Sequence, residues 1–582
     1  MANQSGNEMT SSLENATTGG RGSLPPRVSQ TGRSNLKPMP LSSSTWTRAG
    51  HLGLLADGSR FDVMVVGGGV TGCGTALDLA ARGLKVALVE QHDFASGTSG
   101  RSTKLLHGGI RYLPQFQFQL VAEGLREQEV LARIADYLFE SLEFVVPVYK
   151  HIGLADAPAW AARGRRASAA LRAGLLLYDL LGGLDRPGSR HRRISVAELK
   201  RDIPNLRTNG LRSGFVYSDA QTDDARLVIA IARTAVDRFG AVAVNRATAT
   251  AVDSLRDGYL VTVHDLSSGE DVKIEARTVV VATGAFPAPS VDGSPQLDVI
   301  VSKGAHLVVD REQIGLGDRA IVLPRTDDGR VMYIVPWADH ALIGTTDTPY
   351  DGDLAHPAAD PEDIEYLVRH VVRYLDVAPF QPISTFAGLR ALADDGSGDT
   401  AQASREHLIA EPRPGYVQVA GGKLTTYRRI SAEAANVVAR RLRLTAKSST
   451  KDLPLSGAGT GAAIGDGHSP PTDRVARARY RRYGVNASEI DAIVRASPDL
   501  DRVLGDRLTS LAEVVHACRH EAAVSISDFT LRRTRLGWLT EDHARGDQHA
   551  IAAVMAGELG WSESEIGRQI ESHEAELLSE GL

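Results

Sequence analysis

Three glycines, Gly67, Gly69 and Gly72, form a G-x-G-x-x-G sequence directly after an apolar run at residues 61–66. In such a sequence the first glycine permits a tight turn, the second lets the backbone approach a pyrophosphate, and the third allows a helix to pack closely on a strand. The N–H groups at the start of that helix then face the phosphate charge. Glu90 ends a second apolar run, where its carboxylate can accept hydrogen bonds from a ribose. The pattern predicts a dinucleotide site, because a glycine-rich turn without a ligand leaves Glu90 unexplained.

The residues after Glu90 favour FAD over NAD as the dinucleotide. A polar, glycine-rich loop at 96–104 precedes the sequence L-L-H-G-G-I-R-Y-L at 105–113, where a nicotinamide dehydrogenase would begin a third strand. Such a loop suits an extended cofactor whose far end must be enclosed. Much later, a buried strand ends in A-T-G at 282–284, and its glycine would let the backbone approach the cofactor. Flavoproteins of this kind insert a substrate domain between the two motifs.

A third contact with the cofactor is expected from a strand at 417–420, a turn at 421–423 and a helix at 424–440. The positive end of that helix could stabilise negative charge on a reduced flavin ring. The predicted cofactor-binding residues are Gly67, Gly69, Gly72, Glu90, Ser99, Ser102, Thr103, His107, Gly108, Gly109, Thr283, Gly284, Gly422, Leu424 and Thr425.

Four cationic side chains follow glycines or strands: Arg111, Arg390, Arg405 and Lys423. Isolated arginines are usually surface residues, and each of the four taken alone fits that interpretation. If they converge in one pocket, they would bind a small dianion, since charge-assisted hydrogen bonds contribute about 1.5–3 kcal/mol each. The sequence therefore predicts a phosphate-sized anion site next to the flavin.

Several longer motifs carry a resemblance to a known family. They are S-T-K-L-L-H-G-G-I-R-Y-L, D-A-Q-T-D-D-A-R, S-K-G-A-H-L-V-V, I-G-T-T-D, the G-L-R that ends at Arg390, G-G-K-L-T-T-Y-R and E-V-V-H-A-C-R-H-E. Together, from about Thr45 to Trp538, the chain resembles the aerobic, FAD-dependent glycerol-3-phosphate dehydrogenases of bacteria and mitochondria. Ala391 departs from the family, in which many relatives have proline at this position.

The resemblance implies a reaction and a set of site residues. The family oxidises sn-glycerol 3-phosphate to dihydroxyacetone phosphate and passes the electrons to a membrane quinone. By motif, the substrate pocket would contain Arg111, Tyr112, His306, Thr345, Arg390, Arg405 and Lys423. Among these, His306, Arg390 and Lys423 are the expected catalytic residues. His306 could take the proton of the C2 hydroxyl, since a histidine suits proton transfer near pH 7; alternatively, it only hydrogen-bonds the substrate.

Composition excludes several other classes of protein. A net charge of −6 argues against a general nucleic-acid binder. The two cysteines, Cys73 and Cys518, cannot hold an iron–sulfur cluster, and no zinc spacing is present, so no metal is expected. His516 and His520 are four residues apart, but a structural role is expected for them in the absence of a third ligand. Because no second nicotinamide motif is present, a diffusible electron acceptor is implied.

The order of motifs predicts an α/β protein with a helical C-terminal region. Residues 44–455 would form an FAD-binding Rossmann-like domain, of the glutathione-reductase/D-amino-acid-oxidase type, interleaved with a substrate domain built on an antiparallel sheet. Residues 1–43, rich in Ser, Thr, Asn, Gly and Pro, are expected to be a disordered tail. A linker is expected at 456–471 and a helical cap domain at 472–582. A homodimer is compatible with the sequence, which leaves the oligomeric state open.

A basic amphipathic segment lies at residues 158–193, where Trp160 and several leucines alternate with Arg163, Arg165 and Arg166. Such a segment can lie on an anionic membrane surface, or it can be a solvated basic face over core leucines. No apolar run reaches the ~20 residues that span a bilayer. We expect a cytoplasmic protein that associates peripherally with the inner face of the cell membrane.

Two other functions fit the same motifs. One is a glycerol-3-phosphate oxidase that reduces O2, or a related FAD-dependent amino-acid or hydroxy-acid oxidoreductase. The other is a flavin-dependent scaffold without catalysis. Hydrogen peroxide yield would distinguish an oxidase from a dehydrogenase, and an unchanged flavin spectrum with every substrate would indicate a scaffold.

Overall fold

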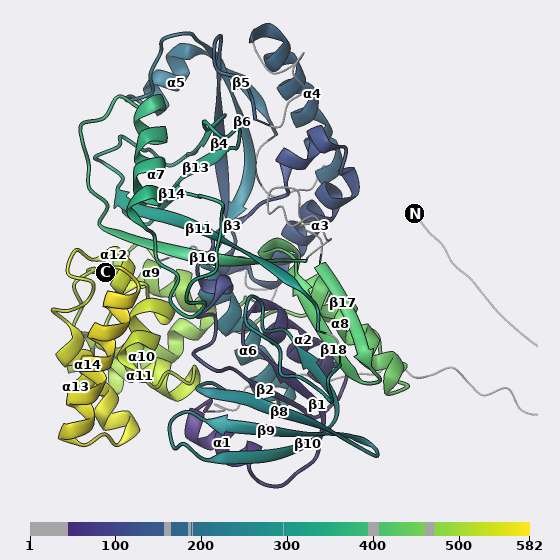
Figure 1. Ribbon diagram of the computed structural model, residues 1–582. Helices are drawn as coiled ribbons and strands as arrows, with labels where there is room; N and C mark the ends of the chain where they lie inside the picture. Colours follow the sequence, from purple (N-terminus) through teal and green to yellow (C-terminus); the bar gives the residue numbers. More distant parts are fainter. Residues whose placement is uncertain are drawn as a thin grey trace, which may run out of the picture. The chain divides into compact units, whose positions relative to one another are not determined.

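The structure is a computed structural model that describes residues 45–155, 164–183, 188, 190–294, 296–393, 407–459 and 471–582. The tail predicted at 1–43 lies outside these residues, as does most of the linker predicted at 456–471. Figure 1 shows two sheets and the helices of the C-terminal region, drawn in yellow. In the described part of the chain, no helix is long and apolar enough to cross a bilayer.

The first sheet carries the glycine-rich motif. Its strands are β1 (Phe61–Val66), β2 (Val86–Val89), β7 (Val242–Val244), β10 (Asp271–Val281), β17 (His407–Arg413) and β18 (Tyr416–Gly421), in the order β17-β18-β10-β1-β2-β7. The pairs from β18 to β7 are parallel, and β17 adds an antiparallel edge. Residues of β1, β2 and β7 are almost all buried, because helices cover one face of this sheet and an antiparallel ribbon covers much of the other.

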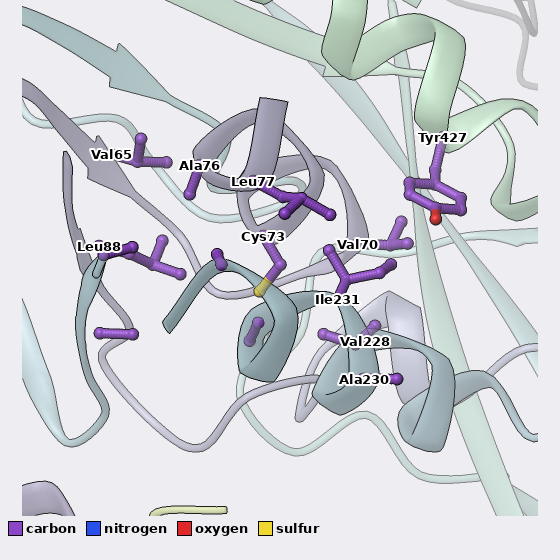
Figure 2. Close-up of a cluster of buried hydrophobic side chains, with 14 of the residues drawn as sticks. Val65, Val70, Cys73, Ala76, Leu77, Leu88, Val228, Ala230, Ile231 and Tyr427 are labelled. Carbon is purple, nitrogen blue, oxygen red and sulfur yellow. The ribbon is translucent and has the colours of Figure 1, made fainter. Parts of the chain in front are cut away.

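Small residues let the first helix approach this sheet. Helix α2 (Val70–Ala81) packs against both α6 (Asp224–Phe239) and α8 (Tyr427–Arg441) beside the parallel strands. Figure 2 shows Cys73, Ala76 and Leu77 of α2 between the strands and the side chains of α6, with Tyr427 of α8 nearby. Cys73 is fully buried and acts as a small packing residue, which favours the structural interpretation of this cysteine.

An antiparallel ribbon extends the first sheet through β8 (Ala247–Leu255), β9 (Gly258–Asp265) and the start of β10. In the sequence, the alternating pattern from residue 241 to 263 predicts that the ribbon begins at 241, and this prediction is wrong. Residues 242–244 form β7, which pairs in parallel with β2. All three are buried, so they continue the nucleotide-binding sheet instead of alternating between core and solvent.

The second sheet is almost entirely antiparallel, as predicted. Its strands are β3 (Leu105–Leu106), β4 (Glu140–Tyr149), β5 (Arg192–Ile194), β6 (Leu211–Gln221), β11 (Val299–Asp310), β12 (Ala320–Leu323), β13 (Met332–Trp337), β14 (His340–Gly344), β15 (Thr348–Pro349) and β16 (Ser384–Ala393). The order is β15-β11-β14-β13-β12-β4-β6-β3, with β16 also on β11 and β5 also on β6. Among the described strands of this second sheet, only β12 and β4 pair in parallel.

The remaining helices begin and end at expected signals. They are α1 (Arg48–Leu55), α3 (Phe118–Ile134), α4 (Gly164–Gly182), α5 (Val196–Asp202), α7 (Pro361–Tyr374), α9 (Arg474–Tyr483), α10 (Ala487–Ala496), α11 (Leu511–His520), α12 (Leu536–Leu539), α13 (Gln548–Leu559) and α14 (Glu563–Ser579). Ser195 and Glu198 form the predicted capping box of α5. Gly560 ends α13 in the left-handed conformation, and Ser562 caps α14.

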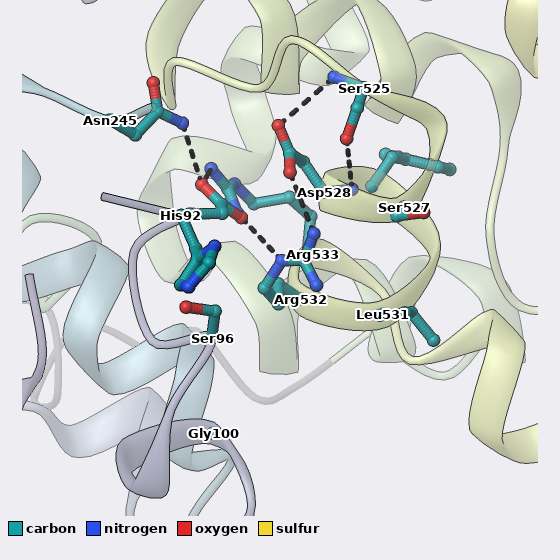
Figure 3. A network of polar contacts seen from close by, with 12 residues as sticks. His92, Ser96, Gly100, Asn245, Ser525, Ser527, Asp528, Leu531, Arg532 and Arg533 are labelled. Carbon is teal, nitrogen blue, oxygen red and sulfur yellow. Dashed lines mark hydrogen bonds and ion pairs between the residues drawn. The ribbon is translucent and has the colours of Figure 1, made fainter. Parts of the chain in front are cut away.

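A buried ion network joins the helical C-terminal region to the first sheet (Figure 3). Asp93, which has no solvent exposure, accepts from Arg532 Nε at 2.8 Å and from Arg533 Nη1 at 2.7 Å. Asn245 Nδ2 donates to the same carboxylate at 2.9 Å, and Asp528 pairs with Arg532. Removing one partner of such a network leaves a buried charge without compensation, which costs about 3–5 kcal/mol.

Candidate functional site

One cleft brings together the two sheets and the turn after β18. Its predicted cofactor residues are Gly67, Gly69, Glu90, Ser99, Ser102, Thr103, His107, Thr283, Gly284, Gly422, Leu424 and Thr425. Its predicted substrate residues are Arg111, Tyr112, Thr345, Arg390 and Lys423. Gly72, Gly108, Gly109 and His306 are not among the lining residues, and Arg405 lies outside the described part of the chain.

The glycines of the first motif have distinct roles. Gly67 has φ +110°, and a Cβ there would lie 2.4 Å from the carbonyl oxygen of Ala282, so only glycine fits this turn. A Cβ on Gly72 would lie 1.8 Å from the carbonyl oxygen of Gly67, which means that Gly72 permits α2 to pack on the turn. Gly69 borders the cleft itself, with Ser99 Oγ 3.1 Å from the place of its missing Cβ.

The start of α2 and the end of β2 suit an extended dinucleotide. The Val70 N–H donates to Ser99 Oγ at 2.9 Å, and the first turn of α2 contains no acidic side chain. Glu90 accepts from the N–H groups of Gly68 at 2.6 Å and His92 at 2.8 Å. Burial raises the pKa of Glu90, although these N–H donors oppose the rise. A side-chain-free turn, a helix N-terminus and a fixed carboxylate fit the pyrophosphate and ribose of FAD.

Gly108 and Gly109 shape the turn that presents the substrate residues instead of lining the cleft. Gly109 has φ +84°, and a Cβ there would lie 2.6 Å from the Tyr112 ring. A Cβ on Gly108 would lie 2.3 Å from Tyr178 Oη, while the Gly108 N–H donates to Asp219 Oδ1 at 3.1 Å. The 3-10 helix η2 (Ile110–Gln115) follows at once and carries Arg111 and Tyr112 to the cleft.

Arg111, Tyr112 and Lys423 form a compact cationic group. Lys423 Nζ lies 4.0 Å from the centre of the Tyr112 ring, and Arg111 Nη2 donates to Tyr112 Oη at 3.0 Å. Burial raises the pKa of Tyr112, but the two cations outweigh burial and the net pKa is lowered. Burial lowers the pKa of Lys423, with Tyr112 acting in the opposite direction. The pKa of Tyr112 is lowered because the cations favour an anion beside them, and the pKa of Lys423 is lowered because its charge is buried; an anion bound in the cleft would favour the charged form of Lys423.

Arg390 is held in place by the second sheet. Its Nη1 donates to Asp347 Oδ1 at 3.1 Å, and its Nη2 donates to Thr345 Oγ1 and the Thr346 carbonyl, both at 3.1 Å. A Cβ on Gly304 would lie 2.3 Å from Nη2, so this glycine leaves room for the guanidinium. Burial lowers the pKa of Arg390, and Asp347 opposes the change. The guanidinium is therefore preoriented in the cleft, with a carboxylate behind it.

The two histidines that were predicted for the site, His107 and His306, are both neutral near pH 7. Burial lowers the pKa of His107, which lines the cleft, to about 3, and Lys423 and Arg111 add to the effect. His306 is 2% exposed and lies behind Thr103, whose Oγ1 is 2.9 Å from His306 Nε2. Burial, followed by Arg390 and Lys104, lowers the pKa of His306 well below its usual value. The ring stacks on Phe386 at 4.8 Å, and Nδ1 has no hydrogen-bond partner.

Sequence reasoning missed a buried ion cluster behind the loop at 96–104. Lys104 Nζ donates to Asp224 Oδ1 at 2.9 Å, and Arg535 pairs with the same carboxylate and with Asp223. Burial, followed by Arg535, lowers the pKa of Lys104 to about 8. The sequence predicts that both Asp223 and Asp224 stabilise the N-terminus of α6; Asp223 does cap the helix, whereas Asp224 pairs with Lys104 and Arg535. The sequence did contain a signal for this cluster: one carboxylate is enough to cap one helix, so the second carboxylate needs another partner.

Comparisons with known proteins agree with this geometry. Residues 62–428 match the family model described as FAD dependent oxidoreductase, and residues 448–566 match that of the C-terminal domain of alpha-glycerophosphate oxidase. Glycerol-3-phosphate dehydrogenase 2 of Mycobacterium tuberculosis (strain H37Rv) is 38% identical over 544 residues, covering 90% of this chain and 89% of that protein. The aerobic glycerol-3-phosphate dehydrogenase of Staphylococcus saprophyticus is 32% identical over 530 residues, covering 87% and 92%.

A solved structure is similar over the same extent. The glycerol-3-phosphate dehydrogenase of Bacillus halodurans, determined in complex with FAD, superposes with a TM-score of 0.72 at 26% identity. The match covers 92% of this chain and 97% of the Bacillus chain. The similarity therefore includes both sheets and the helical C-terminal region.

Proposed function

Because the chain belongs to the FAD-dependent glycerol-3-phosphate dehydrogenases, we propose that it oxidises sn-glycerol 3-phosphate to dihydroxyacetone phosphate and that a membrane quinone receives the electrons. The observation that carries the proposal is the convergence of Arg111, Arg390 and Lys423 in the cleft that the glycine-rich motif also lines. FAD, when bound, supplies the hydride acceptor. The cleft residues bind and orient the substrate and move its hydroxyl proton.

Residues of the first sheet and the loops around it would hold the cofactor. The Gly67–Gly69 turn and the N-terminus of α2 would receive the pyrophosphate, and Glu90 the ribose. Thr283 and Gly284 after β10, and Gly422 to Thr425 after β18, line the cleft from the other side. The turn after β18 also carries Lys423, so the cofactor and the substrate would meet at this turn.

The phosphate group would bind between the three cations. Arg390 offers a guanidinium fixed by Asp347 and Thr345, while Arg111 and Lys423 flank Tyr112. A dianion in this position would receive charge-assisted hydrogen bonds in a partly desolvated site, where they are stronger than in water. Glycerol has no phosphate group to make these contacts, so it should be a very poor substrate.

The proton of the C2 hydroxyl would reach His306 through Thr103. Thr103 lines the cleft, and its Oγ1 is hydrogen-bonded to His306 Nε2 at 2.9 Å. The neutral imidazole can accept the proton that the threonine hydroxyl passes on, which keeps His306 as the proposed base although its ring does not border the cleft. His107, a neutral histidine that borders the cleft and lies near Lys423 and Arg111, is the competing candidate.

An exposed apolar surface near the cleft supports membrane association. Leu176 and Leu180 of α4 are 52% and 77% exposed, and Phe116 and Phe118 are 78% and 40% exposed. Helix α4 packs against η2 and α3, and its opposite face buries Leu175. The segment thus combines a core face with an exposed apolar face, and exposed Arg172 is suited to anionic lipid. Trp160 and Arg163 of the predicted segment lie outside the described residues.

Two experiments test the proposal. Purified protein should contain FAD, and anaerobic glycerol 3-phosphate should bleach the visible absorbance of the oxidised flavin. If the absorbance does not change, glycerol 3-phosphate is not the substrate. Liposomes with anionic lipid should sediment the wild type but not a Leu176→Ser/Leu180→Ser variant, whereas Leu578→Ser, a control leucine that is 69% exposed on α14, should bind normally. Equal binding of all three would exclude this surface.

A glycerol-3-phosphate oxidase is the second candidate. The family model that matches residues 448–566 is described from an oxidase, so O2 must be tested as the acceptor. We expect reoxidation by a quinone analogue to be much faster than by air. Stoichiometric hydrogen peroxide with no gain from quinone would favour the oxidase.

A further inference from the structure

The loop at residues 96–104, here called the flavin loop, borders the cleft with one side only. Ser96, Gly97, Thr98, Ser99, Ser102 and Thr103 line the cleft. Apart from the 3-10 turn η1 (Thr98–Gly100), the flavin loop lacks regular structure, and no strand pairing holds it. Its conformation must therefore depend on the side chains that contact its other side.

One of these contacts is made by a residue far along the chain. Arg101 forms a two-pronged ion pair with Glu580, which follows α14, and Arg101 Nη1 lies 2.6 Å from Glu580 Oε2. Glu580 is fully buried, and the side chain of Arg101 is 9% exposed. The remaining donor of the guanidinium, Nε, donates to the carbonyl oxygen of Ser96 at 2.8 Å. Arg101 thus closes the flavin loop on itself while Glu580 holds Arg101.

A second contact comes from the same C-terminal region. Arg535 Nη1 donates to the carbonyl oxygen of Gly100 at 3.2 Å, and Lys104 Nζ donates to it at 3.3 Å. Ser102 is fixed by Asp224 Oδ2, which accepts from its N–H at 3.0 Å and from its hydroxyl at 2.7 Å. Arg535 also pairs with Asp224, so the two contacts form one connected set.

We propose that Glu580 is a positioning residue for the cofactor: its ion pair with Arg101 keeps the flavin loop in the conformation that FAD binds. Glu580 itself is not among the residues that line the cleft. Neutralising Glu580 would leave a buried guanidinium without a counter-charge, which the flavin loop can relieve by moving. If FAD binds only molecules with an ordered flavin loop, the apparent FAD dissociation constant equals the intrinsic one divided by the fraction of such molecules. A smaller ordered fraction therefore means weaker FAD binding.

Glu580→Gln in the full chain tests this proposal, because glutamine keeps the shape of the side chain and removes its charge. We expect the FAD dissociation constant, followed by the recovery of FAD fluorescence, to rise by about tenfold or more, the factor that 1.4 kcal/mol produces. Amide hydrogen exchange in the FAD-free protein should accelerate at residues 96–104. Neither measurement requires turnover.

Glu513→Gln is the matched control. Glu513 is fully buried and forms a two-pronged pair with Arg482, at 2.9 Å for both contacts, but it does not touch the flavin loop. This variant should lose thermal stability and retain the FAD affinity of the wild type. If both variants release FAD equally, or if exchange at 96–104 is unchanged in Glu580→Gln, the proposal is wrong.

Arg101→Lys provides a second variant should Glu580→Gln fail to fold. Lysine keeps the charge but cannot bond both carboxylate oxygens and Ser96 at once. Weaker FAD binding together with faster exchange at 96–104 would support the proposal. Wild-type values for both would overturn it.

Discussion

Replacing Arg390 by alanine tests the phosphate site most directly. The guanidinium is one of three cations that line the cleft, and it is the one fixed by a carboxylate, with Nη1 3.1 Å from Asp347 Oδ1. Alanine removes the charge-assisted bond to the substrate, about 1.5–3 kcal/mol. It also leaves Asp347, whose side chain is 9% exposed, without its bond to Arg390, with Arg330 Nη1 3.5 Å from the carboxylate.

The two effects add in the same direction, so we expect a loss of about 3 kcal/mol in transition-state binding. This corresponds to a fall in kcat/KM of roughly 10²-fold for glycerol 3-phosphate. The flavin content, read from absorbance, should be unchanged because Arg390 lies on β16 of the second sheet. Glycerol should be a poor substrate of both proteins, since it cannot engage the cations.

Two controls separate charge from structure. Arg311→Ala removes an arginine that pairs with exposed Asp318 near the end of β11, outside the cleft, and should leave kcat/KM unchanged. Asp347→Asn added to Arg390→Ala should recover part of the loss because it removes the carboxylate that has lost its bond to Arg390. A fall of less than threefold in Arg390→Ala, or equal use of glycerol and its phosphate by the wild type, would refute the assignment of the phosphate site.

Three further predictions concern the glycines, the proposed base and the pH dependence of stability. Gly69→Val should fold but bind no FAD, whereas Gly72→Ala should fail to fold or unfold at much lower temperature, because its Cβ would lie 1.8 Å from the Gly67 carbonyl; FAD retention in Gly69→Val would contradict the first. Thr103→Val should lower kcat as much as His306→Asn does, and both variants should alter the pH profile of kcat. If kcat and its pH profile change only in His107→Asn, His107 is the base. Burial, opposed by Asp237, lowers the pKa of His51 from 6.5 to about 4. The unfolded chain therefore binds more protons between these values, and stability is full above pH 6.5 and falls by about 2 kcal/mol at pH 5. The decline from pH 7 to 5, measured by urea unfolding, should be smaller by this amount in His51→Gln, and an unchanged decline would exclude His51 as its source.

The elements around the first motif could be predicted because their signals are local. The apolar run, the three glycines, the helix and Glu90 follow one another within one βαβ unit, and the structure has them in that order. The predicted fold class is confirmed by the two sheets and by the family matches. β7 was assigned to the wrong part of the sheet because an apolar triplet of β-branched and small residues fits both an alternating ribbon and a buried parallel strand. The domain boundaries at 455 and 471 stay predictions.

The site could be predicted where a residue of suitable chemistry stands next to a glycine or within a recognisable motif. Arg111 and Lys423 follow glycines, Arg390 ends a motif, and the structure brings all three to one cleft. A family motif placed His306 in the substrate pocket and its chemistry suggested the role of base, but its ring does not line the cleft. Its position depends on packing, since a Cβ on Gly344 of the neighbouring strand would lie 2.3 Å from the His306 ring. The space that seats the ring behind Thr103 is thus made by a residue on another strand, which no local pattern reveals.

The contacts that order the flavin loop were missed for a related reason. Asp224 and Arg535 are separated by 311 residues, and Arg101 and Glu580 by 479. An acidic residue at a helix start has a sufficient local explanation, and so does an acidic residue after a C-terminal helix. Only the structure shows that Asp224 and Glu580 are buried. A buried carboxylate needs a cationic or hydrogen-bonding partner, and that partner can lie far away in the sequence.

The charges in the cleft also indicate which kind of substrate can be held there. Arg111, Lys423 and Arg390 all line the cleft, and the first two lie against the Tyr112 ring. A phosphate monoester carries nearly two negative charges at neutral pH and three acceptor oxygens, so it can accept charge-assisted hydrogen bonds from more of these side chains than a carboxylate can. Burial is the first cause of the lowered pKa of both Lys423 and Arg390, and an anion in the cleft would favour their charged forms again. The three cations therefore favour glycerol 3-phosphate over the carboxylate substrates of related flavoenzymes.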